Sequence, residues 1–138
     1  MSDTPPRPPS DLVDLLERPL IAYLSTLGQS GAPSVLPINY VWDGTNVWIS
    51  TRTTRQKYRN MARDARVALV IQDPDDQVRY LELRGRVTRI HADPTAERSS
   101  RIRVRYGGSG EPESPPDPLL VVLEITPEKF GRFQGRWQ

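Results

Sequence analysis

The sequence predicts an α+β protein, mainly β, in which six antiparallel strands form a small barrel with short flanking helices. Three observations lead to this class. The chain has 138 residues, the length of one domain that buries a real core. Short apolar or alternating segments recur at close spacing, and turn residues separate most of them. Two or three segments with helical periodicity interrupt these strands.

The N-terminal end predicts a tail followed by a short helix. Residues 1–9 are rich in proline and are expected to be a disordered tail, so that one folded domain spans residues 10–138. Ser10 is expected to cap a helix whose apolar stripe consists of Leu12, Leu15 and Leu16.

An antiparallel meander is expected next. Its strands are predicted over residues 20–27, 34–42 and 46–51. Pro37 removes one hydrogen-bond donor from the second strand. That strand should therefore lie at an edge of the sheet, contain a bulge, or face a ligand.

The remaining segments predict two more helices and three more strands. A helix with Thr53 or Thr54 as its cap should present one apolar face, made of Tyr58, Met61, Ala62 and Ala65. Another helix is expected from Asp93 to about Tyr106. The three strands are expected over residues 66–72, buried on both faces, 80–90, bent or bulged at Gly85, and 119–125.

Composition excludes several function classes. The chain has no cysteine, so disulfides, thiolate metal sites and cysteine nucleophiles are excluded. Residues 1–10 lack the apolar core of a signal peptide, and no apolar run reaches membrane-spanning length, so we expect a cytoplasmic protein. No metal site is expected either, because Asp73, Asp75 and Asp76 beside Pro74 are typical of a polar turn.

A basic segment is the clearest functional feature. Five of the 19 basic residues fall within twelve positions, at Arg52, Arg55, Lys57, Arg59 and Arg63. Cations in the first turn of a helix are repelled by the helix dipole, which makes sense if an anion binds there. The same spacing also suits a solvated helix face. From the spacing alone, the two interpretations have equal weight.

Four segments together resemble a known family. They are residues 46–51, 55–61, 63–69 and 79–87, in that order along the chain. The sequence is similar to the pyridoxamine 5′-phosphate oxidase-like FMN-binding split-barrel family over roughly residues 10 to 130, and most similar to its actinobacterial branch that uses the deazaflavin coenzyme F420. The resemblance implies a split barrel that forms a homodimer, with a cofactor site in each of two grooves at the subunit interface.

The resemblance also implies which residues bind the cofactor. The phosphate would be bound by Arg55, Gln56 and Lys57, with the Thr54 hydroxyl at the same helix start. Ser50 and Thr51 would contact the ring or the ribityl chain, and Gln77 and Arg79 would come from the second subunit. The strand that would lie along the ring consists of Leu36, Pro37, Ile38, Asn39 and Tyr40.

These expectations favour an F420H2-dependent reductase that transfers hydride to an unsaturated small molecule. An FMN-dependent oxidase or reductase of the same fold and a non-catalytic F420 carrier are the alternatives. Nucleic-acid binding is disfavoured, because the net charge is only +2 and no strand interleaves aromatic and basic residues. No catalytic side chain is identified: His91 is expected to be exposed and incidental, and Tyr40, Tyr80 or water are candidate proton donors. Trp137, on an aromatic and basic tail, is a candidate cover for the ring.

Overall fold

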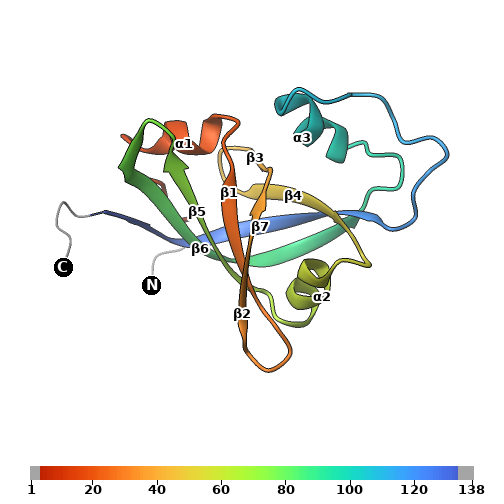
Figure 1. Cartoon of the computed structure of the whole chain (residues 1–138), viewed down its shortest axis with the longest axis horizontal. Helices are drawn as coiled ribbons and strands as arrows, with labels where there is room; N and C mark the ends of the chain where they lie inside the picture. The colour runs from red at the N-terminus through yellow and green to blue at the C-terminus, as the bar shows by residue number, and fades with distance from the viewer. Residues whose placement is uncertain (1–3, 134–138) are drawn as a thin grey trace.

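The protein, described by a computed structural model over residues 4–133, is one antiparallel sheet of seven strands with three short helices (Figure 1). The helices are α1 (Val13–Glu17), α2 (Gln56–Arg63) and α3 (Ser99–Arg105). The strands are β1 (Ala22–Leu27), β2 (Pro33–Ile38), β3 (Val41–Trp42), β4 (Val47–Arg52), β5 (Arg66–Asp73), β6 (Asp76–Ala92) and β7 (Leu120–Arg132). The α+β class and the antiparallel arrangement are confirmed.

The sheet is open, and it has a seventh strand because one predicted strand is divided between its two edges. The order is β2-β1-β5-β6-β7-β4-β3, so β2 and β3 are the edges. Residues 34–42 were predicted as one strand, but Ile38 pairs with Ala22 of β1 whereas Val41 pairs with Trp48 of β4. The chain therefore crosses from one edge of the sheet to the other at Asn39 and Tyr40. This crossing joins the two edges without a ladder of strand hydrogen bonds, as in a split barrel.

Pro37 and Gly85 behave as predicted. Pro37 lies on the edge strand β2, where a missing donor costs little. The pairing of β6 with β7 shifts its register between Arg84 and Gly85, which is the expected bulge. A Cβ atom at Gly85 would lie 2.3 Å from the carbonyl oxygen of Thr126. Only glycine fits this close approach of the two strands.

Other local predictions were wrong. Strand β5 is not buried on both faces: Val67, Leu69 and Ile71 point into the core, whereas Ala68 and Val70 are half-buried on the outer face. The strand expected over residues 80–90 begins earlier, at Asp76, because Asp73 and Asp76 pair directly and close a tighter hairpin.

The helix starts also differ from the predictions. No threonine side chain caps α2, whose N-cap is Arg55, and Ser10 does not cap α1, whose N-cap is Leu12. Helix α3 begins at Ser99 rather than near Asp93, since the chain between them turns through Ala96 with φ of 62°. The Asp93 carboxylate still binds that helix start, accepting hydrogen bonds from the backbone N–H groups of Arg98 and Ser99 at 3.1 and 2.8 Å.

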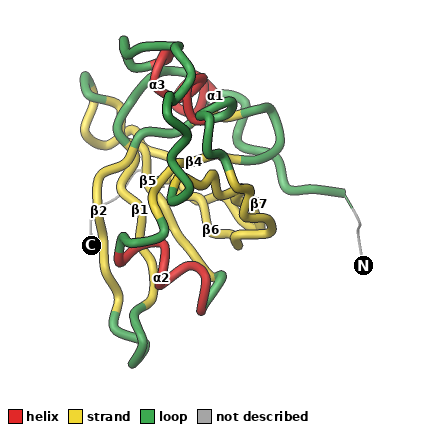
Figure 2. Tube along the Cα trace, turned by 90° about the vertical axis from the view of Figure 1, so that its right-hand side faces the viewer, coloured by secondary structure: helices red, strands yellow, loops and turns green. Residues whose placement is uncertain are grey.

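The core lies inside the curved sheet and beneath α1. The predicted stripe of Leu12, Leu15 and Leu16 is fully buried, which confirms its role. Helices α1 and α3 lie at one end of the barrel and α2 at the other (Figure 2). Within residues 4–133, no helix is long and apolar enough to cross a membrane.

Candidate functional site

Two adjoining hollows, of about 410 and 430 Å³, lie between the edge strand β2, strand β4, the start of α2 and helix α3. They share Ser50 and Lys57, and we call them together the groove. Residues that the resemblance implied make up most of the lining, namely Leu36, Pro37, Ile38, Asn39, Ser50, Thr51, Arg55, Gln56 and Lys57. The groove is therefore where segments 36–39, 50–51 and 55–57 meet.

The open sheet creates this groove. An edge strand presents backbone N–H and C=O groups without strand partners, and β2 is such an edge. On β4 the side chains alternate, so Ile49 points into the core while Ser50 and Arg52 point outward. The exposed Leu36 and Pro37 give the opposite wall an apolar surface. The result is a slot with one apolar wall and one wall that carries hydroxyl groups.

The basic segment divides into two groups. The guanidinium of Arg59 donates to the side-chain oxygen of Gln56 at 3.0 Å, and that of Arg63 donates to the carbonyl of Leu27 at 3.1 Å. Arg55 and Lys57 instead line the groove. Within residues 4–133, neither of them has a carboxylate partner. Arg59 and Arg63 therefore fit the interpretation as a helix face without a ligand, and Arg55 and Lys57 fit the interpretation as an anion site.

Lys57 is more constrained than Arg55. Burial, and secondarily the neighbouring charge of Arg55, lowers the pKa of its ammonium group. Two like charges are thus held close together, one of them partly out of water, without an anion to compensate them. An anionic group bound between them would offset both the repulsion between the two charges and the partial desolvation of Lys57.

Gln56 has a structural partner as well as a place in the groove. Its amide nitrogen donates to Asn60 at 2.8 Å, and the buried Asn60 amide donates to the Thr26 hydroxyl at 3.0 Å. This polar chain fixes the first turn of α2 against β1. It therefore fixes the positions of Arg55 and Lys57 relative to the sheet.

Helix α3 contributes residues that the sequence did not single out. Ile102 and Arg103 line the groove, and so do Ile21 at the start of β1 and Arg52 at the end of β4. Arg52 was visible as part of the basic segment. Ile102 and Arg103 lie about fifty residues further along the chain, and helical periodicity alone does not reveal what a helix packs against.

Four predicted site residues lie outside the groove lining, and Tyr40 and Thr54 are the two nearest to it in sequence. The side chain of Tyr40 is fully buried, and its hydroxyl donates to the carbonyl of Leu15 at 2.6 Å. Burial raises the pKa of this hydroxyl, so it stays a neutral donor to the end of α1. The backbone N–H of Tyr40 also has a partner, because it donates to the hydroxyl of Tyr106 at 3.3 Å. Thr54 is exposed in the turn before α2.

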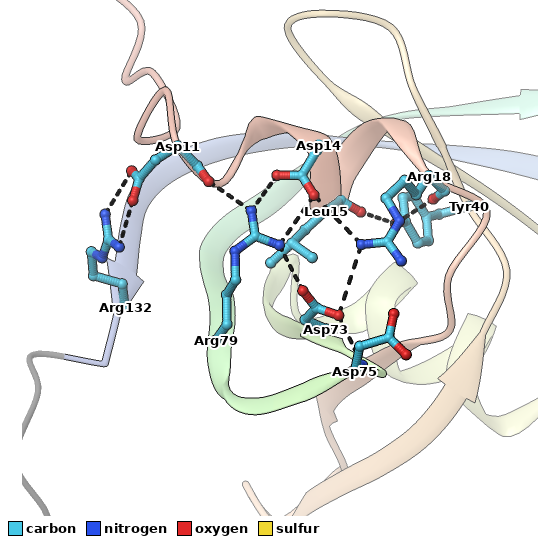
Figure 3. Close-up of polar contacts among 9 residues, drawn as sticks. All are labelled: Asp11, Asp14, Leu15, Arg18, Tyr40, Asp73, Asp75, Arg79 and Arg132. Carbon is cyan, nitrogen blue, oxygen red and sulfur yellow. Dashed lines mark hydrogen bonds and ion pairs between the residues drawn. The ribbon is translucent and has the colours of Figure 1, made fainter.

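Arg79 is held within its own chain, between Asp14 and Asp73 (Figure 3). Its guanidinium donates to Asp73 at 2.8 Å, to the carbonyl of Asp11 at 2.7 Å, and to both carboxylate oxygens of Asp14. The carboxylate of Asp11 accepts two hydrogen bonds of 2.7 Å from Arg132. We call this set the α1 clamp, because it ties α1 to the β5–β6 hairpin and to β7. Gln77 is exposed on β6 beside it.

His91 is neither fully exposed nor isolated, contrary to the prediction. It is half-buried, its ring stacks on Trp48 with centroids 5.2 Å apart, and its Nε2 lies 3.3 Å from the carboxylate of Glu124. Arg98 covers the Trp48 ring at 4.9 Å. These contacts make His91 part of the packing between β4, β6 and β7. The Trp137 tail lies outside the described residues.

The groove lining contains no carboxylate, imidazole or thiol among the described residues. It offers cations, hydroxyl groups, an amide and an apolar wall. Such a surface suits a planar molecule with an anionic extension.

Comparison with known proteins agrees with this geometry. The sequence profile of pyridoxamine 5′-phosphate oxidase matches residues 9–133. The chain belongs to the pyridoxamine 5′-phosphate oxidase family. This confirms the resemblance drawn from the sequence. A search among the curated proteins finds no match.

Solved structures of this family and fold give a more detailed comparison. An F420 reductase is 37% identical, with a TM-score of 0.83, covering 89% of this chain and 98% of its own. This relative fits the F420-dependent branch. A conserved hypothetical protein from Mycobacterium tuberculosis has 23% identity and a TM-score of 0.68, covering 94% of this chain and 82% of its own. HupZ from Group A Streptococcus has 18% identity and a TM-score of 0.69, covering 92% and 94%. The last two show a common fold only.

Proposed function

We propose that this member of the pyridoxamine 5′-phosphate oxidase family is an F420H2-dependent reductase whose deazaflavin binds in the groove. The observation that carries the proposal is the pair Arg55 and Lys57, two groove cations without carboxylate partners in the described chain, at the end of a slot with an apolar wall. The 37% identical F420 reductase supports the choice of cofactor. The bound deazaflavin would supply the hydride for an unsaturated small-molecule substrate.

The protein residues would bind and orient the cofactor, and they would exclude water from it. Arg55 and Lys57 would hold the cofactor phosphate by charge-assisted hydrogen bonds. The ring would lie along residues 36–39, where the free edge of β2 offers backbone groups to the ring edge and Pro37 adds apolar surface. Ser50 and Thr51 would contact the ring or the ribityl hydroxyl groups.

A homodimer is part of this proposal. The outer faces of β1 and β2 expose large apolar side chains, with Tyr23 at 45% and Val35 at 63%. Neighbouring Ile21 is 44% exposed. Apolar side chains gathered at this density favour burial against another protein surface. A second copy bound here would complete the groove, with Gln77 and Arg79 as the residues expected from it.

FMN is the alternative cofactor, because the family is named for an FMN-type oxidase activity and both cofactors carry a flat ring and a phosphate. F420 carries additional carboxylates in its lactyl-glutamate tail. The groove is lined by four cations, Arg52, Arg55, Lys57 and Arg103, but Arg52 and Arg103 also pair with carboxylates of their own chain. The number of cations therefore does not separate the two cofactors, and the 37% identity to an F420 reductase favours F420.

Parallel titrations of the protein with F420 and with FMN test the proposal. Trp48 lies two residues before Ser50 on β4, so quenching of tryptophan fluorescence should report binding in the groove. We expect F420 to quench at lower concentration than FMN. Tight FMN binding without a response to F420 would refute the choice of cofactor. Oxidation of F420H2 in the presence of unsaturated acceptors then separates a reductase from a carrier, which would bind F420 but show no turnover.

A further inference from the structure

The loop between α3 and β7, residues 107–119, carries the carboxylates of Glu111, Glu113 and Asp117, and we call it the acidic loop. In Figure 1 it leaves α3, swings outward and returns to the start of β7. Two of its backbone N–H groups anchor it to the turn before α3: Glu113 donates to Thr95 at 2.9 Å and Asp117 donates to Pro94 at 2.8 Å. The loop thus has a defined position beside the groove.

This loop pairs with two of the four groove cations. The Asp117 carboxylate accepts a hydrogen bond from Arg52 at 2.8 Å. The Glu113 carboxylate lies 3.4 Å from the guanidinium of Arg103, which also donates to the carbonyl of Glu111 at 3.1 Å. Hydrogen bonds from the Leu119 backbone and from Arg52 keep the pKa of Asp117 below its usual range, so this carboxylate is charged at neutral pH.

The groove therefore has two kinds of cation. Arg55 and Lys57 form an inner pair that has no carboxylate partner in the described chain. Arg52 and Arg103 form an outer pair, and each already faces a carboxylate of the same loop. A ligand with a single phosphate needs only the inner pair. A ligand with further carboxylates can pair with Arg52 and Arg103 in place of Asp117 and Glu113.

We infer that the acidic loop is an intramolecular competitor that occupies Arg52 and Arg103 until a ligand with a long anionic tail displaces it. This inference rests on the proposed function and concerns the regulation of the same groove. The loop carboxylates mimic the tail carboxylates chemically, so displacement exchanges one set of ion pairs for another. The exposed fraction of Arg52, 45%, and of Arg103, 38%, leaves both pairs open to solvent and easy to exchange.

The variants Asp117→Asn and Glu113→Gln test the inference with F420 that carries either a short or a long glutamate tail. The amide oxygen introduced by Asp117→Asn would still accept the hydrogen bond that Leu119 donates to Asp117 at 2.9 Å, so the loop should keep its turn. Because an exposed ion pair is worth up to about 1 kcal/mol, we expect each variant to bind the long tail roughly two- to fivefold more tightly. The double variant should gain roughly tenfold, and binding of the short tail should change less than about twofold.

Glu111→Gln is the matched control, because it removes the same charge from the same loop while no ion pair of the described chain includes Glu111. Its affinities should equal those of the wild-type protein. If affinity rises equally for short and long tails, or equally in the control, the cause is the removal of a negative charge in general and not the release of Arg52 and Arg103. Either result would overturn the inference. Unchanged long-tail affinity in the double variant would overturn it as well, while leaving the proposed function intact.

Amide hydrogen exchange of the wild-type protein gives a second test that requires no variant. Addition of long-tail F420 should speed exchange at the backbone N–H groups of Glu113 and Asp117, since displacement frees them from Thr95 and Pro94. Short-tail F420 should leave their exchange unchanged. If both forms bind and neither changes the loop, the inference is wrong. If no form of F420 binds at all, the inference fails together with the proposed function.

Discussion

The α1 clamp and the groove are both rich in arginine, but their cations have different surroundings. In the clamp, Arg79 contacts three acidic residues of its own chain, and Arg132 forms two hydrogen bonds with Asp11. In the groove, Arg55 and Lys57 have no acidic partner in the described chain, and burial lowers the pKa of Lys57. Folding alone explains the first arrangement. The second holds two like charges together, and the anionic ligand proposed above would offset their repulsion.

The largest expected effect is on ligand affinity in the groove. In Arg55→Ala and Lys57→Ala, loss of a charge-assisted contact should weaken F420 binding by about 1.5–3 kcal/mol, or roughly 10- to 150-fold. The free energy of unfolding should stay the same or rise, because each change removes a repelling cation. Fluorescence titration and chemical denaturation measure the two quantities. Arg59→Ala, on the same helix but bonded to Gln56, should leave both nearly unchanged.

The clamp should show a clear effect on the stability of the fold. Arg79→Ala leaves Asp14 and Asp73 without their main cation, and hydrogen bonds to charged groups are worth about 1.5–3 kcal/mol. We therefore expect a loss of about 2 kcal/mol in the free energy of unfolding, measured by urea denaturation. The control Arg84→Ala removes an arginine that is 61% exposed and that, within residues 4–133, forms an ion pair with Glu82 alone. If both variants lose the same stability, the clamp is no more than a surface feature.

Tyr40 offers a smaller test of whether a residue serves the fold or the ligand, because it was predicted to contact the ring and its side chain lies in the core. Tyr40→Phe removes the donor to the carbonyl of Leu15 and should lower the free energy of unfolding by about 1 kcal/mol. Cofactor affinity should stay the same, since the side chain is fully buried. A clear loss of F420 affinity with unchanged stability would show instead that the hydroxyl reaches the ligand.

These cases show what the sequence could predict. The strand pattern around Leu81 and Leu83, the edge position of Pro37 and the bulge at Gly85 follow from rules that act over a few residues. The meeting of segments 36–39, 50–51 and 55–57 was anticipated only through the family resemblance, because composition and spacing do not determine how distant segments pack.

The rest depends on contacts between residues far apart in the sequence. Arg79 lies 65 residues from Asp14, and nothing around it marks that pairing. Arg103 lines the groove because α3 packs near β3 and β4, and α3 begins late because Ala96 turns the chain. The break at Asn39 and Tyr40 follows from the pairing of β2 with β1 and of β3 with β4. Local patterns do not encode such pairings.

The α1 clamp and the groove should respond to pH at opposite ends of the pH scale. The clamp should affect the stability of the fold at acidic pH. A hydrogen bond from Arg79 lowers the pKa of Asp14, one from the Asp75 backbone lowers that of Asp73, and one from Arg132 lowers that of Asp11. Carboxylates with a lowered folded-state pKa stabilise the fold fully above their unfolded value of about 3.9. That stability is lost as the pH falls through the lower folded values. The free energy of unfolding should therefore decline below about pH 4, and less steeply in Arg79→Ala.

Lys57 should make the affinity for F420 depend on pH in the alkaline range. Burial lowers its pKa below the ordinary value of 10.5, so the ammonium loses its proton at a lower pH than a solvated lysine. A neutral amine forms no ion pair with a phosphate, so F420 affinity should fall as the pH rises through this lowered pKa. Stability should rise over the same range, because the folded state then no longer holds a desolvated charge. Titrations between about pH 7 and 10.5 measure the affinity, and Lys57→Ala should remove this limb of the profile. If the limb persists in Lys57→Ala, another group carries the phosphate contact.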